Sequence, residues 1–508
     1  MNSTTEFNRV TFGLPVETFR ISAHIALDER LPIVTEFVLR LLRICSRVKL
    51  SELRDYFGFT DSEALSMVES LARQGLLEVE EDDVQLTAFA IERFEEAGGD
   101  HPRFSKVELK QDTVTFDLIS FMPLRADRGS VPSDNIIKLD ADEEVLGGSI
   151  ERAKNAYRHR YPEIASMRED LREKSFGVYS IEDVESRRRS YVPIPVSFSL
   201  DNEGQVVRGI DTAFEQIAPA DLLQFVNEQV TGCIPRTLSL GQPGLEDFID
   251  TFNVQVMRRY VVGKKFDLNG FIMDVHIAKS VKFPKGTIPI IGNLYLPRNR
   301  ERILTRLADR RDGKRRHGKL LSSLAWLVPD YPLWGRGEAF ASTVASLVSM
   351  LRSSNMSDDL YLFASTEQGA EVSTTNLFRV QGLRELHFCG SQGSDGRIMG
   401  GRVELMLYPT GFVAALFHIS LPGNDGLWLP IGFISTLPRH LDVAHKLLRQ
   451  SMAAGKYGGR ARFRQADSKV PPRSFEDACP FLSYESLSAK GVQDVPDDED
   501  IEDSEPEH

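Results

Sequence analysis

Hydrophobic residues near the N-terminus recur with the period of an α-helix. The segments 32–46 and 49–58 each place apolar residues on one face, and Thr60 and Glu63 form a capping box that starts a third helix over 61–75. The following residues alternate like a two-stranded hairpin. The residues predicted to face inward are Ile33, Phe37, Leu41 and Ile44 in the first helix, Leu50, Leu53 and Phe57 in the second, and Leu65, Val68 and Leu71 in the third.

Three helices and a hairpin in this order resemble a winged helix-turn-helix domain, which we assign to residues 1–95. The resemblance implies a helix that reads DNA with Arg, Lys, Asn or Gln side chains. Here that helix carries three carboxylates against the single Arg73, and the hairpin adds five more at 78–83. This acidic surface favours contact with another protein, while the basic residues at 40–49 keep DNA reading as the alternative.

A mixed α+β middle domain is expected over residues 96–330. It contains no nucleotide-binding loop, metal-ligand spacing or nucleophile elbow. The predicted strands lie at 106–123 and 269–283 and in a hairpin over 190–211, and the predicted helices lie at about 149–185 and at 211–232.

The residues from 331 to 450 follow a helix-strand-helix order and end in three strands. The predicted helices cover 337–354 and 374–388, the latter leading into an edge strand, and a strand lies between them. The order resembles one half of a phospholipase D-like domain. The fold class is therefore α+β with α/β parts: a multidomain protein with an N-terminal winged helix, a mixed middle domain and a C-terminal phospholipase D-like α/β domain.

The phospholipase D resemblance implies a histidine nucleophile that attacks phosphorus, a lysine two residues later, and a Gly-Ser pair followed by an asparagine. Aligning "IGFIST" with the glycine-serine stretch keeps Gly432 but puts Phe433 at the serine and Ser435 at the asparagine. Counting back, Phe412 falls at the histidine and Ala414 at the lysine. This alignment leaves no nucleophile, so the site looks degenerate.

His418 is the one weak catalytic candidate. If it were the nucleophile, Ser420 would stand where the lysine is needed. A histidine within an apolar strand is alternatively a hydrogen-bonded core residue. His387 and His440 flank the same strands, with Asp442 nearby, and would form a site only if they converged on His418. We predict no metal site and no cofactor.

Negative charge is concentrated at the C-terminus. The chain carries a net charge of −13, and nine of these negative charges lie within 491–508, so residues 1–490 carry only −4. We expect a disordered acidic tail. It acts either as a solubility tail or as a nucleic-acid mimic that shields a basic surface.

Positive charge is concentrated at 298–319, where ten Lys or Arg face three acids. Such a run neutralises phosphates, or it forms a solvated helix face and a mobile loop with internal ion pairs. The region 451–490 is expected to be a basic Gly/Arg loop that either stacks on single-stranded nucleic acid or links domains. The nucleic-acid-binding candidates are Arg298, Arg300, Arg306, Arg310, Arg311, Lys314, Arg315, Arg316, Lys319, Lys456, Arg460 and Arg462.

The chain has no signal-peptide pattern at its start and no run of about 18 uncharged apolar residues. We therefore expect a cytoplasmic protein without membrane contact. Its four cysteines lie too far apart in sequence to form a zinc pair and are expected to be buried free thiols.

Three functions from different classes remain open. The preferred one is a non-catalytic, nucleic-acid-associated or scaffold component of a bacterial multi-protein system, whose partners are other proteins of the same operon, such as a helicase, ATPase or nuclease. The domain combination resembles accessory subunits of anti-phage defence systems. The alternatives are a DNA-binding transcriptional regulator that reads two half-sites as a dimer, and a nuclease with an atypical phosphodiesterase site that depends on His418.

Overall fold

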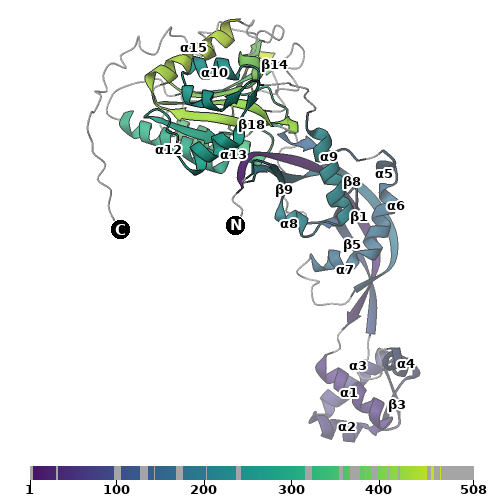
Figure 1. Ribbon diagram of the computed structural model, residues 1–508. Helices are drawn as coiled ribbons and strands as arrows, with labels where there is room; N and C mark the ends of the chain where they lie inside the picture. The colour runs from purple at the N-terminus through teal and green to yellow at the C-terminus, as the bar shows by residue number, and fades with distance from the viewer. Residues whose placement is uncertain are drawn as a thin grey trace. The chain divides into compact units, whose positions relative to one another are not determined.

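The chain is a mixture of helices and strands that divides into two compact units (Figure 1). The smaller unit comprises Val16–Asp127 and Ala141–Ser190, and the larger comprises Met1–Pro15, Arg128–Asp140 and Tyr191–His508. The computed structural model describes residues 4–29, 32–96, 104–125, 135–141, 143–167, 176–201, 203–235, 242–314, 323–353, 359–366, 378–380, 382–383, 385–390, 398–409, 411–421, 424–454, 459–462 and 469–470.

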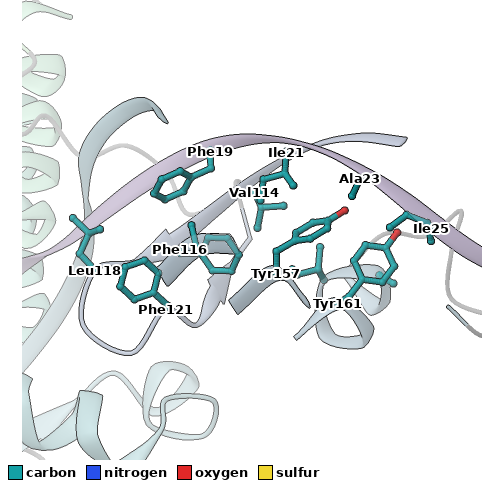
Figure 2. Packing of buried hydrophobic residues seen from close by; sticks show 13 residues of the cluster. Phe19, Ile21, Ala23, Ile25, Val114, Phe116, Leu118, Phe121, Tyr157 and Tyr161 are labelled. Carbon is teal, nitrogen blue, oxygen red and sulfur yellow. The ribbon is translucent and has the colours of Figure 1, made fainter. Parts of the chain in front are cut away.

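The smaller unit is built on a long antiparallel pair of strands. The strand β1 (Thr5–Glu29) pairs with β5 (Phe104–Asp117) from Val16 to Glu29. Two helices, α6 (Ser149–His159) and α7 (Tyr161–Ser166), supply Tyr157 and Tyr161 to a core that they share with β1 and β5, as Figure 2 shows. The Tyr157 hydroxyl donates to Asp112 Oδ2 at 2.5 Å, so its buried polar end is satisfied.

A separate cluster of helices is inserted between β1 and β5. We call it the three-helix domain (residues 33–96) after its first three helices; a fourth helix follows the hairpin. Its core is apolar and contains residues of all its helices. The predicted capping box is present, because Glu63 N donates to Thr60 Oγ1 and Thr60 N donates to Glu63 Oε2. The elements are α1 (Ile33–Cys45), β2 (Arg47–Lys49), α2 (Leu50–Phe57), α3 (Asp61–Arg73), β3 (Leu77–Glu80), β4 (Asp83–Leu86) and α4 (Ala88–Glu96).

The helix α1 lies with the opposite face inward from the one predicted. Its buried residues are Val38, Leu39 and Leu42. The predicted inward residues Ile33 and Ile44 are 74% and 81% exposed. The helix carries apolar residues on two faces, and periodicity does not choose between them. Leu65 of α3 was likewise predicted to face inward and is 49% exposed.

The larger unit contains a nine-stranded sheet in the order β12-β18-β17-β16-β13-β14-β15-β19-β20. Three neighbouring strands, β13, β14 and β15, are parallel, while the other pairs are antiparallel. The strands are β12 (Thr287–Ile291), β13 (Leu324–Leu327), β14 (Leu360–Thr366), β15 (Glu385–Gly390), β16 (Val403–Tyr408), β17 (Phe412–Leu421), β18 (Asn424–Ser435), β19 (Gly459–Arg462) and β20 (Lys469–Val470).

Helices cover both faces of this sheet. On one face, Phe248 of α10 (Leu245–Thr251) packs against Phe417 and Phe433, and α15 (Pro438–Ala454) lies on the same side. On the other face, Phe340 of α13 (Glu338–Arg352) packs against Trp326, and α13 also contacts α12 (Pro297–Lys314). Figure 1 shows these layers on either side of β18. Aromatic packing on both faces therefore holds β16–β18 in the interior.

The remaining elements connect these layers or complete the second sheet, whose order is β6-β5-β1-β8-β9 with β7 paired to β1. No described helix is long and apolar enough to cross a membrane. The remaining bounds are β6 (Pro123–Leu124), β7 (Ile137–Lys138), α5 (Glu143–Gly147), β8 (Phe176–Leu200), β9 (Val206–Ile210), α8 (Thr212–Glu215), α9 (Ala220–Cys233), the 3₁₀ helix η3 (Gln255–Tyr260), β10 (Val261–Val262), β11 (Lys265–Phe266), α11 (Leu268–Phe271), the π-helix η4 (Ile272–Ile277) and the 3₁₀ helix η6 (Ile398–Gly401).

Two of the predicted domains do not follow the strand pairing. Residues 5–29 form β1 and do not belong to the three-helix domain. The boundary between residues 330 and 331 separates β13 from the strands that it pairs with. Sequence adjacency suggested both boundaries, whereas strand pairing joins residues that are far apart in the chain.

Several predicted elements were also wrong. The strand expected at 269–283 is helical over 268–277, where Phe271, Ile272 and Val275 are buried at helical spacing. The helix expected to reach residue 185 gives way to β8 at Phe176. The helix expected over 374–388 is absent from the described residues 378–380 and 382–383, and its remaining part before β15 lies outside the described residues. The basic loop expected at 451–490 contains β19 and β20.

Candidate functional site

His418 is fully buried on β17 and pairs with Glu404 of the neighbouring strand β16. Its Nε2 lies 3.1 Å from Glu404 Oε2, and the other carboxylate oxygen accepts from Trp326 Nε1 at 3.1 Å. The two side chains are 1% and 0% exposed. His418 Nδ1 is buried and has no hydrogen-bond partner among the described residues. The sheet therefore holds the histidine ring through one nitrogen and surrounds it with protein.

Arg402 extends this buried polar network toward the end of β17. Its Nη1 donates to the His418 carbonyl at 3.2 Å and to Ser420 Oγ at 2.9 Å, and its guanidinium lies 4.6 Å from the centre of the Trp428 ring. Burial lowers the pKa of Arg402. Gln242 completes the network, because it donates to the Ser420 carbonyl and accepts from the Ser420 amide, each at 2.8 Å. These contacts hold the C-terminal end of β17 in place.

A surface hollow of about 450 Å³ lies beside Gln242. It is lined by residues from 242–247 and from the β10–β11 turn at 261–265, and His418 is not among them. A molecule held in this hollow would meet the outer side of Gln242 and not the imidazole. Since a general base or nucleophile must come within hydrogen-bond reach of the substrate, His418 could not act on a molecule held in this hollow.

The positions aligned with the phospholipase D pattern do not converge. Phe412, Ala414 and Phe433 are each fully buried. In the β17–β18 ladder Ala414 pairs with Ile434, whereas Phe433 pairs with Ala415. Paired residues share a face of the sheet and neighbours along a strand alternate, so Ala414 and Phe433 lie on opposite faces. Even with other side chains, these positions would not form one pocket in this register.

Ser435, aligned with the asparagine, belongs to a different buried cluster. Its Oγ lies 2.8 Å from His440 Nδ1 and 3.1 Å from Thr287 Oγ1. Burial, with a smaller effect of Arg439, lowers the pKa of His440 to about 4, so the ring is neutral at pH 7. This hydroxyl–imidazole pair is closed over by Phe252 and Phe433. It joins β18 to α15 and offers no open face to a substrate.

The three histidines do not converge. His418 packs against Trp428, His440 against Phe433, and His387 against Tyr361 and Phe363. His387 lies on β15, and three strands separate that strand from β17. Within the part of the chain that the structure describes, no group of three or more His, Cys, Asp or Glu side chains is arranged to hold a metal ion.

The basic run begins as the helix α12, which presents some of its arginines to solvent. Arg298 is exposed, and neither Arg298 nor Arg306 has a hydrogen bond or ion pair among the described residues. Arg300 Nη1 instead donates to Ser342 Oγ at 3.0 Å and ties α12 to α13. Glu301 also makes no ion pair with a described residue. The internal pairing that would make this run a neutral solvated face is therefore not seen in its first turns.

Arg302 was missing from the sequence-based candidates. It lies one turn beyond Arg298, and its Nη1 approaches the Pro289 carbonyl at 3.5 Å. The signal was available, since residues four apart share a helix face.

The other basic candidates are only partly described. The side chains of Arg310, Arg311 and Lys314 at the end of α12 are not described, and Arg315, Arg316, Lys319 and Lys456 lie outside the described residues, as does the acidic tail. Arg460 and Arg462 belong to β19, which pairs with β15. The candidates at 298–314 therefore belong to a helix, whereas Arg460 and Arg462 belong to a strand near the edge of the sheet.

The basic side chains of the three-helix domain are largely neutralised by its own carboxylates. Arg47 lies 3.4 Å from Glu80 and 3.7 Å from Asp83 of the acidic hairpin. Arg54 forms ion pairs with Asp55 and Asp61. Exposed pairs of this kind contribute little stability, but they reduce the positive charge available to a phosphate backbone.

The clearest exposed feature of the three-helix domain is apolar. Ile33, Val34, Phe37 and Ile44 of α1 are 74%, 45%, 53% and 81% exposed, and we call these four residues the α1 face. They recur at helical spacing on the side away from Val38, Leu39 and Leu42. Contiguous exposed apolar surface of this kind marks interaction sites on soluble proteins. Cys45 at the end of the helix is exposed, contrary to the predicted buried thiol.

No protein-family model matches the chain, and no curated protein matches it.

Proposed function

We propose that this protein is a non-catalytic component of a bacterial multi-protein assembly, in which the three-helix domain acts as a winged helix used for protein contact. The single observation that carries the proposal is the α1 face, because a helix that exposes four large apolar residues gains most from burying them against a partner. The accessory subunits of anti-phage defence systems are the proposed setting, with partners encoded in the same operon.

The C-terminal sheet supports the non-catalytic part of the proposal. We propose that it is a phospholipase D-like scaffold without the family's chemistry. The aligned nucleophile and phosphate-holding positions are the buried Phe412 and Ala414, and His418 is held by Glu404 away from the surface hollow. An atypical phosphodiesterase would need an accessible nucleophile, and His418 is buried.

Co-expression with the products of neighbouring genes tests the proposal. The tagged chain is expected to retain one of these proteins through affinity and size-exclusion steps. The double variant Phe37→Glu with Ile44→Glu should lose that protein, because two charges on the α1 face make its burial costly. Tyr179→Glu is the matched control, since Tyr179 is 74% exposed on β8 of the same unit.

Retention of the partner by the α1 variant would contradict protein contact through this face. A circular-dichroism melt of each variant shows whether it is folded, and both should melt within about 2 °C of the parent because the replaced side chains are exposed.

Nucleic-acid association is a second proposed function, favoured by Arg298 and Arg306 on α12, neither of which has an ion pair with a residue that the structure describes. It is compatible with a scaffold role, since one subunit contacts protein through one unit and phosphate through the other. A stand-alone DNA-reading regulator is less well supported, because Arg47 and Arg54 pair with carboxylates of the three-helix domain itself.

A further inference from the structure

The N-terminal end of α12 carries arginine side chains where the helix dipole is also positive. Its first turn contains no acidic residue and includes Arg298 and Arg300. A helix N-terminus carries partial positive charge, so carboxylates stabilise it, whereas arginines at this end are unfavourable. Arg300 is accounted for by its bond to Ser342, but Arg298 is exposed without a partner among the described residues.

The short π-helix η4 brings His276 close to these arginines. Burial first, and then the charges of Arg298 and Arg302, lower the pKa of His276 to about 4. Arg298 also lowers the pKa of Arg302, after the effect of burial. Arg298 and Arg302 therefore lie within electrostatic range of each other and of His276, whose ring is neutral at pH 7. His276 Nε2 is buried and lacks a hydrogen-bond partner among the described residues.

The loop between η4 and β12 adds three more cations. Lys279, Lys282 and Lys285 are all exposed, and none has a hydrogen bond or ion pair within the described part of the chain. The nearest acid in sequence, Asp274, is engaged by the Tyr260 hydroxyl at 3.1 Å. The loop leads into the edge strand β12, and Arg302 reaches the Pro289 carbonyl of that strand, so loop, strand and helix are in one place.

We propose that Arg298, Arg302 and the three loop lysines, which lie around the neutral His276, form one phosphate-binding surface that holds the sugar-phosphate backbone of a nucleic acid. The inference rests on the second proposed function and adds residues that the basic run does not contain. Several separate cations suit a polyanion better than a single phosphate. The 18 residues of α12 extend about 27 Å, which is the length of several nucleotides along one strand.

The contacts would be independent of sequence, because they involve phosphate and not base edges. The positive end of the α12 dipole would act in the same direction as the side chains. Binding an anion here would replace repulsion among like charges by attraction, which gives a physical reason for arginine in the first turn.

Fluorescence anisotropy with labelled single-stranded and duplex DNA of about 20 nucleotides, across a salt series, tests this surface. The triple variant Lys279→Glu, Lys282→Glu and Lys285→Glu should bind roughly 100-fold more weakly at low salt, and its salt slope for duplex should fall by about 2 to 3. The charge-matched control is Arg152→Glu, Arg158→Glu and Arg187→Glu, three exposed arginines of the smaller unit, which should bind like the parent.

Parent-like binding by the loop variant would overturn the inference. If reversal of Arg310 and Arg311 nevertheless weakened binding, nucleic-acid association would stand without this surface. No binding by the parent at low salt would remove both proposals.

Two competitors distinguish nucleic acid from other anionic ligands. Displacement of the DNA by about 1 mM inorganic phosphate at constant ionic strength would assign the site to a free phosphate, and equal binding of polyglutamate would assign it to an acidic protein. Either result would overturn the proposal.

Discussion

Single residues in the C-terminal sheet show why a buried histidine is not sufficient evidence for catalysis. His418 has one ring nitrogen on Glu404, and Glu404 also accepts from Trp326. A carboxylate only accepts hydrogen bonds, so each of these donors helps to keep it in the interior. The same contacts that satisfy Glu404 hold the His418 ring in the interior of the sheet. A structural role explains the residue without further chemistry.

His418→Ala should therefore lower the free energy of unfolding by about 3 kcal/mol, because it leaves the Glu404 carboxylate buried without its partner. Adding Glu404→Gln to this variant should restore at least about 1 kcal/mol, since the amide is neutral and can still accept from Trp326. Urea unfolding measures both values. A further loss of stability in the double variant would contradict this explanation, and loss of a phosphodiesterase activity in His418→Ala would restore the nuclease hypothesis.

The residue types of this site were visible in the sequence, but their partners were not. Glu404 and His418 are 14 positions apart and meet only because Val403 pairs with Phe417 in the β16–β17 ladder. A shift of register by one residue would put them on opposite faces. Gln242 is still further away in sequence, at 178 positions from Ser420. Strand pairing, which local patterns do not specify, determines the site.

At the scale of elements, α12 differs from the other helices on the sheet. The helix α13 buries six residues along one side, as its periodicity predicted. By contrast α12 buries Asn299, Ile303 and Leu307, and its other described side chains include four arginines against the two acids Glu301 and Asp309. The buried Asn299 amide donates to three consecutive carbonyls at 291–293 and fixes the start of the helix against β12. A well-anchored helix with a basic outer surface suits contact with a polyanion.

Reversal of Arg310, Arg311, Arg315 and Arg316 to glutamate should abolish nucleic-acid binding, because four phosphate contacts would become repulsive and the salt slope for duplex DNA would fall by about 3 to 4. Anisotropy at low salt measures the loss, and the melting temperature should change by less than about 2 °C. The matched control reverses Arg152, Arg158, Arg187 and Arg188, which are exposed in the smaller unit. Unchanged affinity in the first variant would end this proposal.

Local patterns predicted helices and hairpins well where one face was clearly apolar. The helices α3 and α13 and the β3–β4 hairpin lie where expected. The pattern failed at α1, whose two apolar faces are equivalent in sequence, and at η4, where β-branched and aromatic residues resemble a strand. The strand β1 was overlooked, although Val10, Phe12 and Leu14 alternate and are all buried. That alternation was a usable signal.

At the scale of the whole molecule, the chain separates two kinds of surface. The smaller unit contains the three-helix domain with its apolar α1 face and self-neutralised charges, and the larger unit contains the closed C-terminal sheet and the basic helix. Under the proposed function, the smaller unit would contact protein and the larger unit nucleic acid.

Hydrogen–deuterium exchange of residues 33–45, compared between the purified chain and its complex with a co-expressed neighbour, tests the central claim most directly. The account predicts that amides of α1 exchange at least about tenfold more slowly in the complex, because burial of the α1 face suppresses local opening of the helix. Unchanged exchange along α1 in a stable complex would contradict protein contact through this helix.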